Sequence, residues 1–215
     1  MLNKLKELNP TIEFYSIKDE EFKTFGRILE LDGSEIIKAA EKLEEIKGGS
    51  KYVASEESFE VLNSAKEIGK ACFGTLPYQT GYCWGENRLF NATEWHTSSE
   101  INIAVTDLVL ILGHEWDIKD NKINSSDFKA FFVPKGSVIE VFATSLHFCP
   151  CQVSNSGFGC VVILPKDTNV PLEEENDNKI LFRKNKWILA HSENSALIER
   201  GVVPGIYGEN YEIKY

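Results

Sequence analysis

Long apolar runs are missing from this sequence. The longest, residues 101–113, is interrupted by Asn102, Thr106 and Asp107. A membrane-spanning helix needs about 18 or more consecutive apolar residues, so we expect no membrane span. The charged residues after Met1 lead into no apolar signal-peptide region. We therefore expect a protein of the cytoplasm.

Basic residues are scarce. Lysine and arginine together number 23 against 33 aspartates and glutamates, which gives a formal net charge of −10. Binding to nucleic acid or to an anionic membrane requires a basic face, because the phosphate groups must be neutralised. We therefore expect neither a nucleic-acid partner nor a membrane partner.

Cysteine is also sparse, and its spacing does not indicate a zinc site. The pair Cys149-Pro-Cys151 lacks the C-x2-C spacing of most zinc sites, and no second pair accompanies it. A cytosolic chain of 215 residues can bury a core without disulfides. We expect all of the cysteines to be reduced thiols packed as small apolar side chains.

The first seventy residues are predicted to be mainly helical. Apolar residues at positions 36, 37, 40, 43 and 46 predict a helix over residues 34–46. Those at 61, 62, 65 and 68 predict a second helix over residues 58–69. We expect residues 1–70 to form a helical extension that packs on the rest of the chain.

Short segments rich in β-branched and aromatic residues follow, separated by turn residues. The predicted strands cover residues 101–112, 130–133, 138–143, 160–164 and 180–183. Many short strands at this spacing are typical of a sandwich or barrel. The predicted fold is therefore a mainly β barrel over residues 71–215 with N-terminal helical segments, α+β overall and a single structural unit.

The strongest cluster of polar residues lies within one expected strand. Alternation places five side chains on one face, namely Glu94, His96, Ser98, Glu100 and Asn102. The apolar continuation of this strand indicates that it lies inside the fold, so the polar face is expected to line a cavity. Imidazole and carboxylate groups that converge in a cavity suit a divalent metal.

Two motifs resemble those of the cupins. Glu94-x-His96-x3-Glu100 is similar to the first cupin motif, H-x-H-x(3,4)-E, with glutamate in place of the first histidine. About thirty residues later, Pro134-Lys-Gly136 matches the P-x-G of the second motif. The resemblance covers roughly residues 75–165, and the whole chain resembles an uncharacterised bacterial family of cupin-like proteins.

The second motif departs from the cupin pattern after its turn. Ile139 stands where the cupin pattern has histidine, Glu140 lies one place late, and His147 lies later still. Since Glu140 and His147 are seven residues apart, a regular strand would point them to opposite faces. Both can face one pocket only if a bulge or bend intervenes.

The resemblance implies a jelly-roll barrel that binds a divalent metal (Zn, Mn, Ni or Fe) through His96, Glu100 and His147. Cupin-type sugar isomerases use such a set: the metal polarises a carbonyl and a carboxylate moves the proton. Glu94 or Glu140 is the expected base, and Glu94 is equally well interpreted as a ligand. The expected activity is that of an isomerase, epimerase or lyase acting on a sugar or sugar phosphate.

Substrate contacts are expected from Arg88 and Asn102, with Lys129 and Lys135 as further candidates for holding a phosphate. The expected partner is thus a small carbohydrate. Cupins often dimerise, so a homodimer is a second expectation.

Two other functions remain open. A non-haem iron dioxygenase needs two histidines and one carboxylate, and a sugar-binding or regulatory cupin needs no catalysis. The individual residues also have structural interpretations. His96 and Glu100 could pair on a solvated sheet face, and His147 could be a buried structural histidine. His114 is expected at the surface and His191 at an edge or loop.

Overall fold

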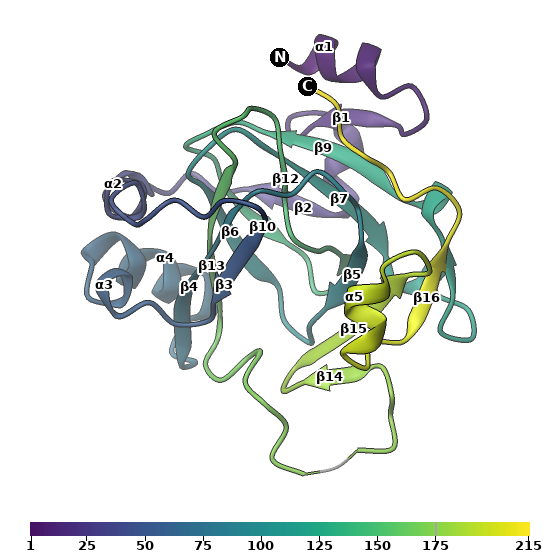
Figure 1. Cartoon of the computed structure of the whole chain (residues 1–215). Helices are drawn as coiled ribbons and strands as arrows, with labels where there is room; N and C mark the ends of the chain where they lie inside the picture. The colour runs from purple at the N-terminus through teal and green to yellow at the C-terminus, as the bar shows by residue number, and fades with distance from the viewer. Residues whose placement is uncertain (175) are drawn as a thin grey trace.

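The computed structural model describes residues 1–174 and 176–215, whose strands form three sheets with helices at the edges (Figure 1). The first sheet contains β1 (Phe14–Ser16), β9 (Lys129–Val133), β7 (Leu108–His114), β11 (Ser145–Leu146) and β12 (Cys151–Gln152). The second contains β2 (Gly26–Ile28), β10 (Val138–Val141), β6 (Glu100–Ala104), β13 (Phe158–Pro165), β4 (Tyr78–Gly85) and β3 (Ser50–Val53). The third contains β14 (Leu181–Arg183), β15 (Lys186–His191), β16 (Pro204–Tyr207), β8 (Ile123–Asn124) and β5 (Ala92–Trp95).

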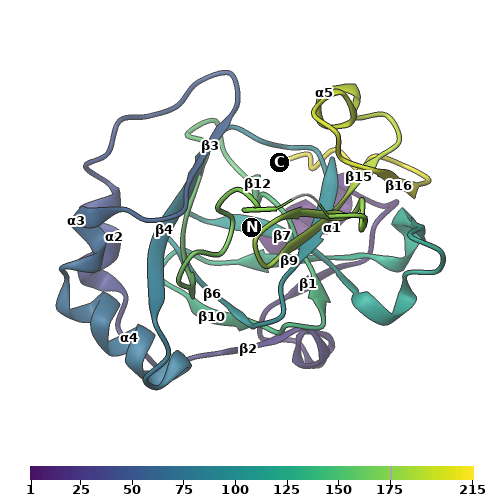
Figure 2. The same ribbon diagram turned by 90° about the horizontal axis from the view of Figure 1, so that it is seen from below.

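The helices are short and lie around these sheets. They are α1 (Leu2–Leu8), α2 (Ser34–Ala40), α3 (Glu57–Glu60), α4 (Asn63–Phe73) and α5 (Ser195–Glu199), with 3-10 turns at Glu20–Thr24, Glu115–Asp117 and Ser125–Asp127. Figure 2 shows α2, α3 and α4 together on one side of the molecule and α5 on another. No helix in the described ranges has the length and apolar character needed to cross a membrane.

The inward-facing apolar side chains of alternate strand residues form the core between the first two sheets. In β7, Leu108, Leu110 and Leu112 point inward, and in β13 Val162 and Leu164 do the same from the opposite sheet. Side chains of a strand point alternately to its two faces. The intervening residues of β7 and β13 therefore lie on the outer faces of the two sheets. The buried polar side chains of Glu100 and Asn102 in β6 also face this inner layer.

The outer faces of both sheets are covered. Ile101 and Ile163 point outward from the six-stranded sheet and pack against Ile36, Phe59 and Ile68 of the helices α2–α4. The outward residues of β7 pack with α1 and the last residues of the chain. A sheet buried on both faces explains why β7 and β13 are almost continuously apolar.

The predicted fold class is confirmed: the chain is mainly β, with helical segments near its N-terminus, and α+β overall. Some element predictions were wrong. The expected helix over 34–46 ends at Ala40, and the second is divided into α3 and α4. Residues 1–70 also supply β1, β2 and β3, which pair with later strands. The division of the chain at residue 70 stays a prediction.

Candidate metal centre

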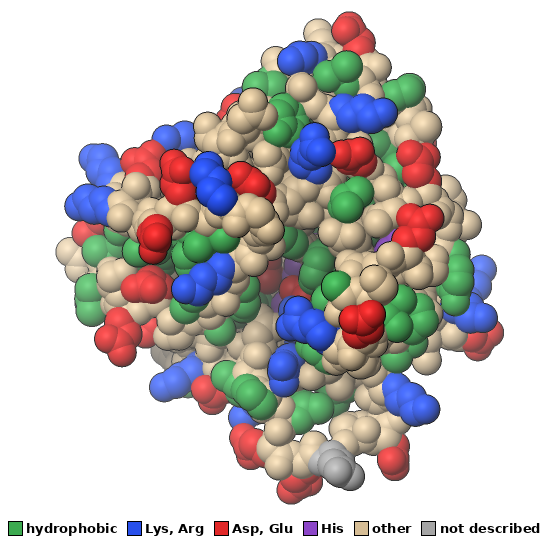
Figure 3. Space-filling model, viewed as in Figure 1, with side chains coloured by type: hydrophobic (Ala, Val, Ile, Leu, Met, Phe, Trp, Pro, Cys, Tyr) green, Lys and Arg blue, Asp and Glu red, His purple; other side chains and the backbone are tan. Residues whose placement is uncertain are grey.

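A pocket of about 390 Å³ opens onto the inner face of the six-stranded sheet. Figure 3 shows a hollow in which acidic and histidine side chains are visible, with basic side chains beside it. The floor includes Glu100 and Asn102 of β6 and Val162 of β13, whereas β3, β14, β15, α5 and the segment 147–150 supply the walls. The volume lies within the range typical of small-molecule sites.

The polar residues around position 96 come from two strands rather than one. β5 ends at Trp95, residues 97–99 leave the extended path, and β6 begins at Glu100. The expectation of a single alternating strand is therefore wrong. Because β5 and β6 belong to different sheets, the chain crosses the pocket between them, and side chains from both strands face the same space.

His147 reaches this space through a second bend. β10 ends at Val141, and the chain then leaves the six-stranded sheet and enters β11, which pairs with β7 in the first sheet. The backbone of His147 pairs with that of Glu94, with N–H···O distances of 2.6 and 3.0 Å in the two directions. This pairing fixes His147 beside β5, in line with the bend that the second motif requires.

Both imidazoles in the pocket are held by backbone carbonyls. Nδ1 of His96 donates to the carbonyl of Asn185 at 2.6 Å, and Nδ1 of His147 donates to the carbonyl of Ser145 at 2.9 Å. In both rings this leaves Nε2 as the atom that faces the carboxylates of the cluster. Both Nε2 atoms are buried without a hydrogen-bond partner among the described residues.

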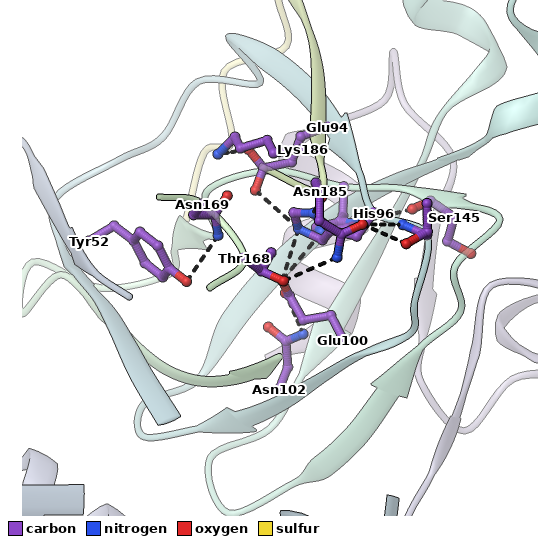
Figure 4. A network of polar contacts seen from close by, with 12 residues as sticks. Tyr52, Glu94, His96, Glu100, Asn102, Ser145, Thr168, Asn169, Asn185 and Lys186 are labelled. Carbon is purple, nitrogen blue, oxygen red and sulfur yellow. Dashed lines mark hydrogen bonds and ion pairs between the residues drawn. The ribbon is translucent and has the colours of Figure 1, made fainter. Parts of the chain in front are cut away.

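Two carboxylates approach these Nε2 atoms (Figure 4). Oε2 of Glu100 lies 3.6 Å from that of His96 and 3.5 Å from that of His147. Oε1 of Glu94 lies 3.9 Å from Nε2 of His96, and its other oxygen forms an ion pair with Lys186. Ligand atoms of Glu94, His96 and His147 all lie within 4.8 Å of one another.

Burial and charge act in opposite directions on the titration of this cluster. Burial disfavours ionised Glu100, but electrostatic attraction by His147 and His96 outweighs it and holds the pKa of Glu100 well below its ordinary value. Burial likewise disfavours charged His147, but Glu100 and then Glu94 outweigh it and raise the pKa of His147 to about 9. The two carboxylates thus draw positive charge to this point in the pocket.

The donor set fits a divalent metal ion. Histidine ligands in metal sites almost always donate their other ring nitrogen to a carbonyl or carboxylate, which orients the free nitrogen. His96 and His147 both show this arrangement, and their unpartnered Nε2 atoms face carboxylate oxygens. A solvated surface pair is wrong for His96 and Glu100, because both side chains are buried.

Asn102 lies in the pocket but contacts Glu100. Its Nδ2 donates to Oε1 of Glu100 at 2.8 Å, and its Oδ1 accepts a hydrogen bond from the Cys160 thiol at 3.0 Å. The amide therefore fixes the oxygen of Glu100 that does not face the imidazoles. Its expected contact with substrate stays a prediction.

Other residues predicted for the site lie elsewhere. Glu140 pairs with Arg27 at 2.6 Å, and its neighbour Ile139 occupies the inner layer, so alternation turns Glu140 away from the pocket. Its prediction as the base is wrong. Arg88 pairs with Glu212 at 2.8 Å and lies outside the pocket lining, so its expected role in substrate binding is also wrong.

The lysines considered for phosphate binding are placed at the surface. Lys129 pairs with Glu13 and Lys135 with Glu41, and neither lines the pocket. Four other cations line it instead: Lys51, Arg183, Lys186 and Arg200. Each lies on a different element and belongs to no recognisable motif, so the sequence did not predict that they line the pocket.

The remaining histidines have structural surroundings. His114 is half-buried and stacks between Phe25 and Trp116, with ring centroids 4.0 and 4.2 Å away. His191 is fully buried at the end of β15, so its expected place at an edge or loop is wrong.

The cysteines are free thiols, as expected. Cys83 and Cys149 both line the pocket, with their Sγ atoms 4.0 Å apart.

Comparison with known proteins gives a family and partial likenesses. Residues 14–211 match the model of a family described as a domain of unknown function (DUF4867). No curated protein matches the sequence. Solved structures similar to part of the chain include two enzymes much longer than it. One is oxalate decarboxylase from Bacillus subtilis at pH 4.6, with 14% identity and a TM-score of 0.37 over 60% of this chain and 28% of that one.

The other is a variant of salicylate 1,2-dioxygenase from Pseudoaminobacter salicylatoxidans, with 7% identity and a TM-score of 0.32 over 60% of this chain and 29% of that one. The match thus spans less than a third of either enzyme.

Proposed function

The chain belongs to the DUF4867 family, and we propose that it is a metal-dependent enzyme that isomerises, epimerises or cleaves a sugar or sugar phosphate. One observation carries the proposal. Two buried imidazoles present unpartnered Nε2 atoms to two carboxylates at the floor of a pocket of about 390 Å³. Such a set has the donor types that zinc, manganese, nickel and iron use in proteins.

His96, His147 and Glu100 are the proposed metal ligands. Oε2 of Glu100 lies at nearly equal distances from both Nε2 atoms, 3.5 and 3.6 Å, and Asn102 holds the other oxygen of the same carboxylate. Glu94 is farther from the imidazoles and is engaged by Lys186. This difference supports Glu100 as the ligand and leaves Glu94 for another role.

Glu94 is the proposed base. When bound, the metal supplies Lewis-acid polarisation of a substrate carbonyl. Glu94 lines the pocket next to the ligand cluster, where its carboxylate can take a proton from the carbon beside that carbonyl and return it to the neighbouring carbon. For isomerisation, the hydroxyl proton of the carbon that loses its hydrogen also passes to the former carbonyl oxygen, so both protons stay with the substrate and no further reactant is consumed. The Lys186 ammonium holds the Glu94 carboxylate in position during this step.

The pocket walls suit a small polar molecule with a carbon skeleton. Polar groups come from Asn102, Tyr52 and Asn169, and apolar contacts come from Phe148 and Ile188. Apolar walls with a few placed polar groups are the usual composition of small-molecule sites. A sugar needs both kinds of contact.

Metal content is the first test. The tag-free protein is analysed by plasma mass spectrometry before and after treatment with a chelator. Near-stoichiometric zinc, manganese, nickel or iron supports the proposal. If the protein contains no metal and takes up none of these four ions, the proposed function is wrong.

Catalysis is tested separately in deuterium oxide. Pentoses, hexoses and their phosphates are incubated with the metal-loaded protein, and NMR follows deuterium entering the carbon beside the carbonyl. Incorporation that Glu94→Gln abolishes supports the assignment of the base. A loaded protein that exchanges and converts none of these sugars is not an enzyme of this class.

The donor set also supports a second candidate. Two histidines and one carboxylate form the iron site of many non-haem oxygenases, and His96, His147 and Glu100 supply these groups. Iron as the resident metal, together with oxygen consumption on addition of a substrate, would favour this reaction over the rearrangement of a sugar.

A further inference from the structure

The lining of the pocket is rich in cations, although the protein as a whole is acidic. The chain has a net charge of −10 and only four arginines, yet Arg183 and Arg200 both line this pocket, with Lys51 beside them. The acidic residues in the lining are Glu94 and Glu100, which lie 3.9 and 3.6 Å from Nε2 of His96. Lys186 pairs with Glu94, whereas the other three lining cations, all in the described part of the chain, form no ion pair with either of these carboxylates.

The arginines outside the pocket differ from those inside it. Arg27 is paired with Glu140, and Arg88 with Glu212. Within residues 1–174 and 176–215, no carboxylate forms an ion pair with Arg183 or Arg200. Among the described residues, carboxylates thus pair with the other two arginines and not with Arg183 or Arg200.

Aromatic rings support two of the pocket cations instead of carboxylates. The guanidinium of Arg183 lies 5.0 Å from the ring centre of Phe182, and Nζ of Lys51 lies 5.4 Å from that of Trp84. A cation over an aromatic face is held in place without losing its charge. Both groups can therefore still attract an anion.

We propose that Arg183, Arg200 and Lys51 form a subsite for the phosphate group of a phosphorylated substrate. The three cations come from β14, the end of α5 and β3, so together they can surround one anion from several sides. Arginine presents forked donors that match phosphate oxygens, and a phosphate monoester carries close to two negative charges. The inference rests on the proposed function, because it places the sugar carbons between this subsite and the ligand cluster.

Binding is tested on the purified full-length protein by isothermal titration calorimetry. The probes are glucose 6-phosphate, glucose, gluconate and inorganic phosphate, each at two salt concentrations. Glucose 6-phosphate should bind more tightly than glucose and gluconate, should lose affinity at higher salt, and should compete with inorganic phosphate. Equal binding of glucose and glucose 6-phosphate, or tighter binding of gluconate, overturns the phosphate assignment.

Arginine variants test where the phosphate group binds. Each of Arg183→Gln and Arg200→Gln should weaken the binding of glucose 6-phosphate about tenfold, because each removes a charge-assisted contact. Arg88→Gln removes an arginine outside the pocket and should leave the affinity unchanged. If the two pocket variants bind as tightly as the parent protein, the subsite is not where we place it.

Metal content measured on the same samples separates the two proposals. The pocket variants should keep the metal content of the parent protein while losing phosphate affinity. A protein that binds glucose 6-phosphate through these arginines but takes up no metal retains the subsite and loses the proposed function. A protein that binds metal but binds glucose and glucose 6-phosphate equally well retains the proposed function and loses the subsite.

Discussion

The backbone carbonyl of Asn185 accepts a hydrogen bond of 2.6 Å from Nδ1 of His96. The side chain of Asn185 binds the same loop, since its Oδ1 accepts from the backbone N–H of Thr97 at 2.9 Å and from its hydroxyl at 2.6 Å. Asn185 itself adopts a left-handed conformation, with φ of 55°. The turn between β14 and β15 therefore orients an imidazole that belongs to another part of the chain.

Replacing Asn185 should weaken metal binding without unfolding the protein. Asn185→Ala loses both contacts with Thr97 and forces alanine into the left-handed region, so we expect a loss of about 1–3 kcal/mol in the free energy of unfolding. Loss of the support behind a ligand typically costs 10- to 100-fold in metal affinity, and we expect roughly that effect here. Urea unfolding and metal titration measure the two quantities.

Two control variants separate the causes. Asn185→Gly tolerates the left-handed backbone, so it should recover part of the stability while still lacking the side-chain contacts. Asn121, with φ of 59°, lies in a turn outside the pocket. Asn121→Ala should destabilise the protein through the same backbone effect but leave metal affinity intact. Equal metal affinity in Asn185→Ala and the parent protein would contradict the role given to this turn.

His96→Ala should abolish metal binding in a protein that still folds. The variant removes a donor and leaves the Asn185 carbonyl unpaired, which we expect to cost about 1–3 kcal/mol of stability. Plasma mass spectrometry measures the metal, and circular dichroism the fold. His114→Ala is the matched control, since His114 lies outside the cluster. Full metal occupancy in His96→Ala would show that the site is assigned wrongly.

The two glutamates should respond differently to neutralisation. Glu100→Gln removes the carboxylate closest to both imidazoles, so metal affinity should fall by at least tenfold. Glu94→Gln should keep the metal and lose turnover, because its proposed role is that of the base. If Glu94→Gln loses metal as severely as Glu100→Gln, Glu94 is a ligand and the base must be sought elsewhere.

The free energy of unfolding of the metal-free protein, prepared with a chelator, should fall at alkaline pH. The pKa of His147 is raised from 6.5 to about 9 in the folded state. A raised pKa stabilises the fold fully below pH 6.5, and this contribution disappears as the pH rises through 9. We expect a loss of at most about 3 kcal/mol over that interval, measured by urea unfolding between pH 6 and pH 9.5. In His147→Gln, the free energy of unfolding should depend less on pH over this interval. If it depends on pH as steeply as in the parent protein, another titrating group causes the effect.

Glu94, His96, Glu100 and His147 could be found from the sequence because they follow two recognisable motifs. The structure brings these four side chains together. Strand alternation also indicated that Glu140 and His147 would point to opposite faces of a regular strand. Only His147 faces the pocket, so a base at position 140 was excluded by the same geometry.

What could not be predicted depends on turns and on contacts between distant segments. The bend at residues 97–99 separates β5 from β6, and a short polar run such as Thr-Ser-Ser carries no clear signal for it. Asn185 contacts His96 from a hairpin turn, and Arg200 lines the pocket from the end of a five-residue helix. Neither belongs to a periodic pattern, so only the tertiary fold reveals them.

The link between His96 and Asn185 has a consequence for the order of events during synthesis. The two residues are 89 positions apart, and at translation rates of 5–20 residues per second the first waits roughly 5–20 s for the second. β5 likewise pairs with β15, which is made only after residue 185. The ligand cluster therefore assembles only after most of the chain has left the ribosome, and a protein truncated before residue 185 would lack a fixed His96.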